Sequence, residues 1–157
     1  LGENGAGKTT LMRVAFGMVA PDAGRLLLGG TERRFATPAD AMRAGLGMVH
    51  QHFALVPAMS VAENVALGGH GRFDRAVAAA RVREIGARTG PALDPAAIAG
   101  PLGVGAQQRL EIVKALAREA RILVLDEPTA VLAPAEAREL LDAAAAAGAS
   151  AGARPTF

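Results

Sequence analysis

From its second residue the chain reads Gly2-Glu3-Asn4-Gly5-Ala6-Gly7-Lys8-Thr9, which has the pattern G-x-x-x-x-G-K-T. This pattern is typical of a loop whose backbone N–H groups surround the phosphates of a nucleotide. Its glycines permit backbone conformations that a Cβ atom would obstruct. Its lysine supplies a positive charge to the β- and γ-phosphates, and its threonine hydroxyl is placed to ligate Mg²⁺. We therefore predict a nucleotide site over residues 2–10, which are Gly2, Glu3, Asn4, Gly5, Ala6, Gly7, Lys8, Thr9 and Thr10, with Thr9 as a metal ligand.

A loop of this kind is supported by a strand before it and a helix after it. Apolar residues recur at helical spacing after the loop, at Leu11, Val14, Ala15 and Met18. They predict a helix whose N-terminal end favours a bound phosphate. The supporting strand would precede Leu1, so we expect the chain to be part of a longer protein. The alternative, a glycine-rich turn before a core helix, does not explain the Gly-Lys-Thr ending of the loop.

Composition limits the class of protein. The 157 residues are 51% hydrophobic, which predicts a folded domain with a sizeable core. Lysine and arginine number 17 against 15 acidic residues, so the net charge of +2 gives no reason to expect a nucleic acid partner. The absence of cysteine excludes disulfides and thiolate metal sites. No apolar run approaches the roughly 20 residues that span a bilayer, and we expect a cytoplasmic location.

Hydrophobic patterns and capping residues predict alternating strands and helices. We expect strands at residues 25–28, 46–49 and 121–125. The last of these, Ile122-Leu123-Val124-Leu125, is a continuous apolar run of the kind that is buried on both faces in a parallel sheet. Helices are predicted at residues 37–44, from Ser60 with Glu63 as a capping box, at 73–88, at 105–120, and from Pro134.

Two carboxylates follow the last predicted strand directly. Asp126 and Glu127 stand where the end of a parallel strand meets the ligand crevice of an α/β sheet. Asp126 is suited to hold Mg²⁺, and Glu127 to orient or deprotonate an attacking water. The alternative is a solvated strand end before the turn at Pro128.

Histidines flank Gln51, and they suggest a second metal site. His50 and His52 are spaced i, i+2, but no further Cys or His ligand lies nearby in sequence. A protein site for a transition metal normally uses at least three side chains. We therefore do not predict a metal at the two histidines.

Four segments in this order resemble the motifs of ABC transporter ATPases. They are Walker A at Gly2 to Thr9, the Q-loop His50-Gln51-His52-Phe53, the signature Leu102-Gly103-Val104-Gly105-Ala106-Gln107-Gln108-Arg109, and Walker B at Ile122 to Thr129. The resemblance covers about residues 1–142. It implies an α/β fold, the three-layer P-loop NTPase core with a parallel sheet and an inserted helical subdomain. The expected division is a first core part at 1–56, a helical subdomain at 57–104, a second core part at 105–142 with Walker B, and a disordered Ala/Gly-rich tail at 143–157.

The resemblance also implies an activity and its residues. ATP would be bound and hydrolysed with Mg²⁺, with Glu127 and Gln51 as catalytic residues. Gln51, Thr9 and Asp126 would surround the metal. Two such domains pair head to tail in the family, so Gly103, Val104, Gly105 and Gln107 would contact ATP bound to the other domain.

Three departures from the family pattern imply impaired turnover. Gly103 stands where the signature has a serine, so a hydroxyl donor to the γ-phosphate is lost. The family's switch histidine follows Walker B, whereas His50, His52 and His70 all precede it. The aromatic residue that stacks on adenine would lie before Leu1.

The segments Met48 to Pro57 and Val61 to Val65 are most similar to importers of simple sugars and nucleosides. The implied partners are a transmembrane permease subunit, a second ATPase domain and, indirectly, a solute-binding protein, with the chain on the inner face of the membrane. One alternative is a nucleotide-binding relic or truncated gene product without catalysis. A soluble ABC ATPase acting on DNA or ribosomes is disfavoured because the interval from Gln51 to Leu102 is short and not basic. A simple P-loop kinase or GTPase would not explain the signature segment.

Overall fold

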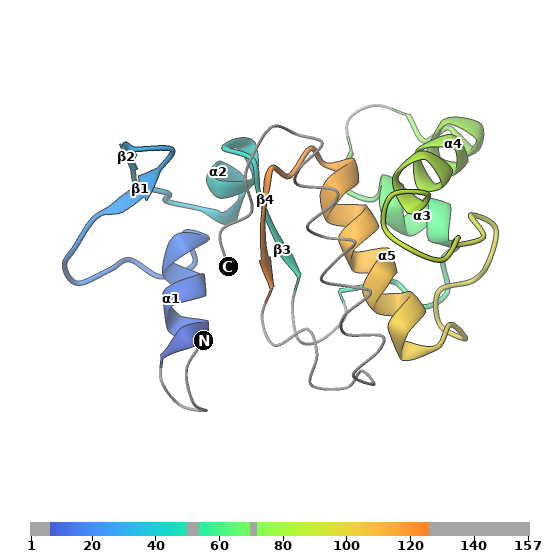
Figure 1. Ribbon diagram of the computed structural model, residues 1–157, viewed down its shortest axis with the longest axis horizontal. Helices are drawn as coiled ribbons and strands as arrows, with labels where there is room; N and C mark the ends of the chain where they lie inside the picture. The colour runs from blue at the N-terminus through green and yellow to red at the C-terminus, as the bar shows by residue number, and fades with distance from the viewer. Residues whose placement is uncertain (1–6, 50–53, 70–71, 126–157) are drawn as a thin grey trace.

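Two parallel strands lie at the centre of the computed structural model, which describes residues 7–49, 54–69 and 72–125 (Figure 1). Strand β3 (Leu46–Val49) pairs with β4 (Ile122–Leu125), and Leu46 lies opposite Ile122. Arg121 extends the pairing, because its N–H donates to the carbonyl of Gly45 at 2.7 Å. Both strands and their parallel direction confirm the prediction.

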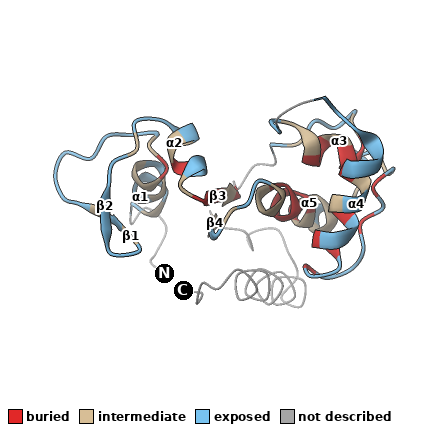
Figure 2. Ribbon diagram, turned by 90° about the horizontal axis from the view of Figure 1, so that it is seen from above, coloured by how far each residue is buried: buried red, intermediate tan, exposed pale blue. Residues whose placement is uncertain are grey.

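Helices cover both faces of this strand pair. Figure 2 shows α1 (Lys8–Ala15) and α2 (Pro38–Arg43) on one side of the strands and α5 (Val104–Ala117) on the other. Side chains of β3 alternate accordingly. Leu46 packs into a cluster with Phe16 and Ala41, whereas Val49 packs against Ile112 of α5. The expected three-layer α/β arrangement is confirmed.

The apolar face predicted for the first helix is wrong in part. Leu11 is 71% exposed and Met18 is 42% exposed, while Phe16 is buried. The helix ends at Ala15, and Gly17 then adopts a left-handed conformation with φ of 68°. The turn at Gly17 takes Met18 out of the helical spacing, whereas Leu11 lies within the helix and is exposed.

A short hairpin precedes α2. Strands β1 (Leu26–Leu28) and β2 (Thr31–Arg33) are antiparallel, and Gly29 and Gly30 connect them with φ of 57° and 78°. Positive φ at both turn residues is the geometry of a tight hairpin turn. β2 was not predicted, because its three residues are exposed and carry no apolar alternation.

A second hydrophobic cluster lies beyond α5. Helices α3 (Val61–Ala66) and α4 (Arg75–Gly86) pack against each other and against α5. Their shared cluster has Val61, Val82, Leu110 and Val113 fully buried at its centre. The division of the chain at residues 57–104 remains a prediction.

Several predicted boundaries and one burial pattern differ. The helices predicted at 73–88 and 105–120 span 75–86 and 104–117. Ile122 is 43% exposed, so β4 is not buried on both faces. In the described part of the chain β4 has only β3 as a neighbouring strand, which leaves its first residue open. The helix predicted from Pro134 and the tail at 143–157 lie outside the described residues.

None of the helices in these described ranges has the length and apolarity to cross a membrane.

Candidate nucleotide site

One edge of the molecule collects the ends of the elements that carry the motifs. In Figure 1 the N-terminal ends of α1 and α5 lie in the lower part of the molecule, and the carboxyl ends of β3 and β4 point toward the same side. The carboxyl edge of a parallel sheet is where α/β proteins bind ligands. Of the predicted site residues, Gly7 to Thr10, Gly103 to Gly105 and Gln107 are described. Gly2 to Ala6, Gln51, Asp126 and Glu127 lie outside the described residues.

The start of α1 has the features of an anion site. Gly7 precedes the helix with φ of 79°, and its carbonyl accepts the N–H of Leu11 at 2.9 Å. An ideal Cβ at Gly7 would have no heavy atom within 4 Å, so this position requires glycine for its conformation and not for space. The first turn holds Lys8, Thr9 and Thr10 and no acidic residue. The positive end of the helix dipole and the lysine both fit a phosphate group.

The start of α5 is a second helix N-terminus without a side-chain cap. Gly103 is its N-cap, with φ of −60° and ψ of 155°, and its carbonyl accepts the N–H of Ala106 at 2.9 Å and of Gln107 at 3.0 Å. Gly103 and Val104 are exposed. The backbone N–H groups of this first turn can therefore bind an anion that is held by another chain.

The Gln107 side chain has a structural role that the sequence did not predict. Its Nε2 donates to the carbonyls of Ala99 at 3.2 Å and Gly100 at 3.1 Å. The amide nitrogen thereby fixes the turn that leads into α5. A contact between Gln107 and nucleotide remains a prediction.

The structure does not bring the two helix starts together. Figures 1 and 2 place α1 and α5 on opposite sides of β3 and β4. Lys8 and Gly103 of one chain therefore lie in different layers. This separation is compatible with a site in which the two segments come from different chains.

Sequence reasoning missed a buried charged pair on α5. Glu111 and Lys114 are 3% and 8% exposed, and Lys114 Nζ lies 3.2 Å from Glu111 Oε1. The available signal was two opposite charges at i, i+3 around the apolar pair Ile112 and Val113. No group of three or more His, Cys, Asp or Glu that could hold a metal occurs within residues 7–49, 54–69 and 72–125.

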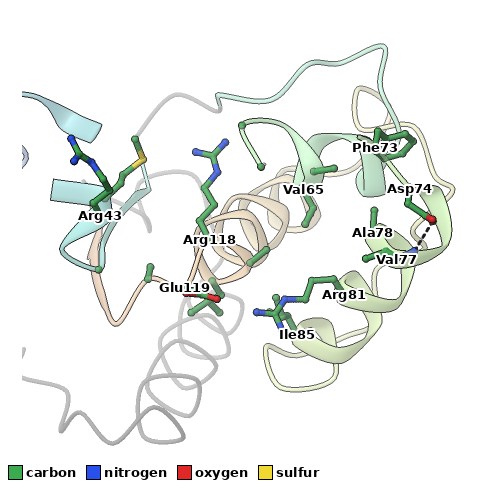
Figure 3. Close-up of a pocket in the computed structure, with 18 of the residues that line it drawn as sticks. Arg43, Val65, Phe73, Asp74, Val77, Ala78, Arg81, Ile85, Arg118 and Glu119 are labelled. Carbon is green, nitrogen blue, oxygen red and sulfur yellow. Dashed lines mark hydrogen bonds between the residues drawn. The ribbon is translucent and has the colours of Figure 1, made fainter. Parts of the chain in front are cut away.

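A groove lies away from the motif residues. Figure 3 shows Phe73, Val77 and Arg81 on one wall, with Arg43 and Arg118 across from them. Six arginines and two acidic residues line the groove: Arg43, Arg72, Arg81, Arg88, Arg118 and Arg121, with Asp74 and Glu119. None of the described motif residues is among its lining residues. It is therefore a surface of net positive charge distinct from the nucleotide edge.

Comparison with known proteins gives consistent matches. A model of the ABC transporter family matches residues 1–130. The chain is 44% identical to the glucose import ATP-binding protein TsgD13 of Haloferax volcanii over 90% of this chain and 32% of that protein. It is 49% identical to the guanosine import ATP-binding protein NupO of Bacillus subtilis over 90% of this chain and 28% of that protein. The chain thus spans less than a third of the length of these two relatives.

A solved structure agrees with the sequence matches. CbiO1 from Clostridium perfringens, part of the ABC transporter complex CbiONQ, superposes with a TM-score of 0.76 at 30% identity. The superposition covers 91% of this chain and 58% of that one.

Proposed function

Because the chain belongs to the ABC transporter ATP-binding family, we propose that it is part of an importer subunit that binds and hydrolyses ATP to drive uptake of a sugar or nucleoside. One observation carries this proposal: the glycine-led start of α1, with Lys8 and Thr9, lies at the carboxyl edge of a parallel strand pair (Figure 1). That arrangement fits the phosphates of a nucleotide. The names of the two import relatives support the solute class.

Each site residue has a proposed task. Lys8 attracts the β- and γ-phosphates, and Thr9, Gln51 and Asp126 would hold Mg²⁺. The metal would offset the negative charge of the phosphates when bound. Glu127 would orient the attacking water or accept its proton. Gln51 and Glu127 follow β3 and β4 in the chain by two residues each, which supports their proposed roles at the carboxyl ends of these strands.

We further propose that a second ATPase domain completes the site. The uncapped start of α5, at Gly103, Val104 and Gly105, would contact ATP held at the start of α1 in the other domain. The location of these two helix starts in different layers supports a contact between chains over one within a chain.

The proposed membrane partner is a permease subunit, which places the chain on the cytoplasmic face of the membrane. The import names of the relatives and the complex that contains CbiO1 support such a partner. The groove between α2, α4 and the end of α5 offers arginines beside the apolar side chains of Phe73 and Val77. The positive charge of the groove suits a permease helix that carries acidic residues. A solute-binding protein would act only through the permease.

The test is ATP binding and hydrolysis by the natural full-length protein and two variants. Lys8→Ala should weaken ATP binding about 10-fold or more, since it removes the charge that faces the phosphates. Glu127→Gln should keep binding and lower kcat by about 10² to 10⁴-fold. Arg13→Ala is the matched control, because it removes a cation from the other end of the same helix. Wild-type protein that does not bind ATP, or equal losses in Arg13→Ala and Lys8→Ala, would refute the proposal.

Gly103 favours a second candidate function, nucleotide binding without turnover. The signature serine is replaced, so closure on ATP loses one donor. The same assays separate the two functions. ATP binding with no hydrolysis above that of Glu127→Gln would select the non-catalytic one.

A further inference from the structure

A buried ion pair lies halfway along α5, between the sheet and the α3–α4 cluster. Glu111 and Lys114 lie on adjacent turns of the same helix, and their side chains are 4% and 10% exposed. Taking two charges out of water is costly, and well-packed apolar residues are often at least as stable at such sites. The pair therefore calls for a role other than stabilising the helix.

Lys114 reaches a segment that lies far from it in sequence. Besides Glu111, its ammonium group donates to the backbone carbonyl of Ala54. Ala54 stands three residues after Gln51, in the stretch that leads from β3 to α3. One flexible lysine thus connects the helix that begins at Gly103 with the segment that carries Gln51.

A second anchor holds the same stretch from the other side. The buried Asn64 of α3 accepts the N–H of Val56 at 2.8 Å and donates to the Val56 carbonyl at 3.0 Å. Residues 54–56 are therefore tied to α3 by Asn64 and to α5 by Lys114. Of these two contacts, only the one made by Lys114 comes from a helix that begins at a motif, the signature segment.

A further polar atom lies on α5 two turns before Lys114. Gln108 is 2% exposed, and its Oε1 has no hydrogen-bond partner in the part of the chain that the structure describes. Buried polar groups are nearly always hydrogen-bonded. Gln108 and Glu111 are thus two buried polar residues three positions apart on α5, in addition to Lys114.

We propose that Lys114, held by Glu111, is a positioning residue that fixes the segment carrying Gln51 relative to α5. This inference rests on the proposed ATP hydrolysis for its effect on rate. A displacement of about 1 Å at a reacting group can cost about 100-fold in rate. Lys114 does not touch the nucleotide in this proposal. It holds the backbone at Ala54, three residues after Gln51 in the chain, against α5.

The experiment compares Lys114→Met with wild type in the natural full-length protein. Amide hydrogen exchange over residues 50–56 should become faster in the variant, because the Ala54 carbonyl loses its anchor. The kcat for Mg²⁺-ATP should fall about 10-fold to 100-fold while ATP affinity stays within about twofold. Lys114→Arg should keep the exchange rate at residues 50–56 and kcat close to their wild-type values, since a guanidinium can donate to the same carbonyl and carboxylate.

Val113→Ala is the matched control for stability. Val113 is a fully buried neighbour on α5 that packs in the α3–α4 cluster, so its truncation should lower the melting temperature without faster exchange at 50–56. Unchanged exchange in Lys114→Met, or equal changes in Val113→Ala, would overturn the proposal. A parallel loss of ATP affinity and kcat in Lys114→Met would also overturn it. A wild type without hydrolysis would contradict the proposed function, and the exchange result would still decide whether Lys114 holds this segment.

Discussion

At the scale of single residues, the two glycines that start the motif helices differ in what they require. Gly7 has a φ of 79°, which L side chains rarely adopt. Gly103 has extended backbone angles and open space at the position of a Cβ. A side chain is therefore excluded by the backbone at Gly7 and permitted at Gly103.

Gly103→Ser should improve both the helix and the site. A serine at an N-cap accepts a backbone N–H of the first turn, which is worth about 0.3 kcal/mol over glycine. Its hydroxyl would also supply the donor that the signature lacks. We expect a slightly higher melting temperature and tighter ATP-dependent pairing, measured by light scattering in the Glu127→Gln background. Gly103→Ala is the control without a hydroxyl. Equal pairing in the serine and alanine variants would show that the hydroxyl does not contribute.

At the scale of elements, local capping decides where several helices begin. Thr37 with Asp40 and Ser60 with Glu63 form capping boxes at the starts of α2 and α3. Asp74 caps α4 by accepting the N–H groups of Ala76 and Val77. The Asp74 cap explains why α4 begins at Arg75 and not at Phe73. The starts of these three helices were predicted to within two residues.

The capping box of α3 makes stability depend on pH. The Ser60 hydroxyl donates to Glu63 Oε2 at 2.6 Å, and with the Ser60 N–H it lowers the pKa of Glu63 below its ordinary value of 4.5. A lowered pKa in the folded state gives stability that is present above pH 4.5 and is lost as the pH falls through the folded value.

We therefore expect Glu63→Gln to be less stable than wild type at neutral pH, with the difference shrinking as the pH falls below 4.5. Urea denaturation at a series of pH values measures this. Glu84→Gln is the control, since Glu84 pairs with Arg81 at the surface and such exposed ion pairs contribute little to stability. A stability difference for Glu63→Gln that is independent of pH would contradict the assignment.

At the scale of the whole molecule, the layers meet at closely packed small residues. Gly47 of β3 faces the α5 side, where an ideal Cβ would lie 2.7 Å from Ala120 Cβ and 3.2 Å from Ala115 Cβ. Ala120 in the α5–β4 connection and Ala115 in α5 thus pack against the strand at a point where no side chain fits. The contact joins residues about 70 positions apart in sequence, and it sets how closely α5 approaches the sheet.

Gly47→Ala should destabilise the protein by about 1–3 kcal/mol, because the new methyl group has to displace a packed layer. The free energy of unfolding in urea measures the loss. Gly86→Ala is the control and should change the free energy of unfolding in the opposite direction. Gly86 lies in α4, and an ideal Cβ there would have no heavy atom within 4 Å. Alanine there should stabilise by about 0.5–1 kcal/mol through helix propensity. A neutral Gly47→Ala would mean that α5 can move away from the strand at little cost.

Features that depend on neighbours along the chain could be predicted from the amino-acid sequence. These are the phosphate-loop pattern that ends at Lys8 and Thr9, the capped starts of α2 and α3, and the boundaries of β3. The order of the four motifs also predicted the family, and the apolar run at residues 122–125 predicted a strand of a parallel sheet. Caps, turns and apolar runs act over a few residues, so the sequence shows them directly.

Contacts between side chains that are far apart in sequence could not be predicted and follow from the packing of the layers. It buried Phe16 and left Leu11 and Met18 exposed, and it gathered the starts of α1 and α5 on one edge but in different layers. It also joined Lys114 to Ala54 across 60 residues. These outcomes depend on how the layers pack and turn, and the spacing of residues along one element does not contain that information.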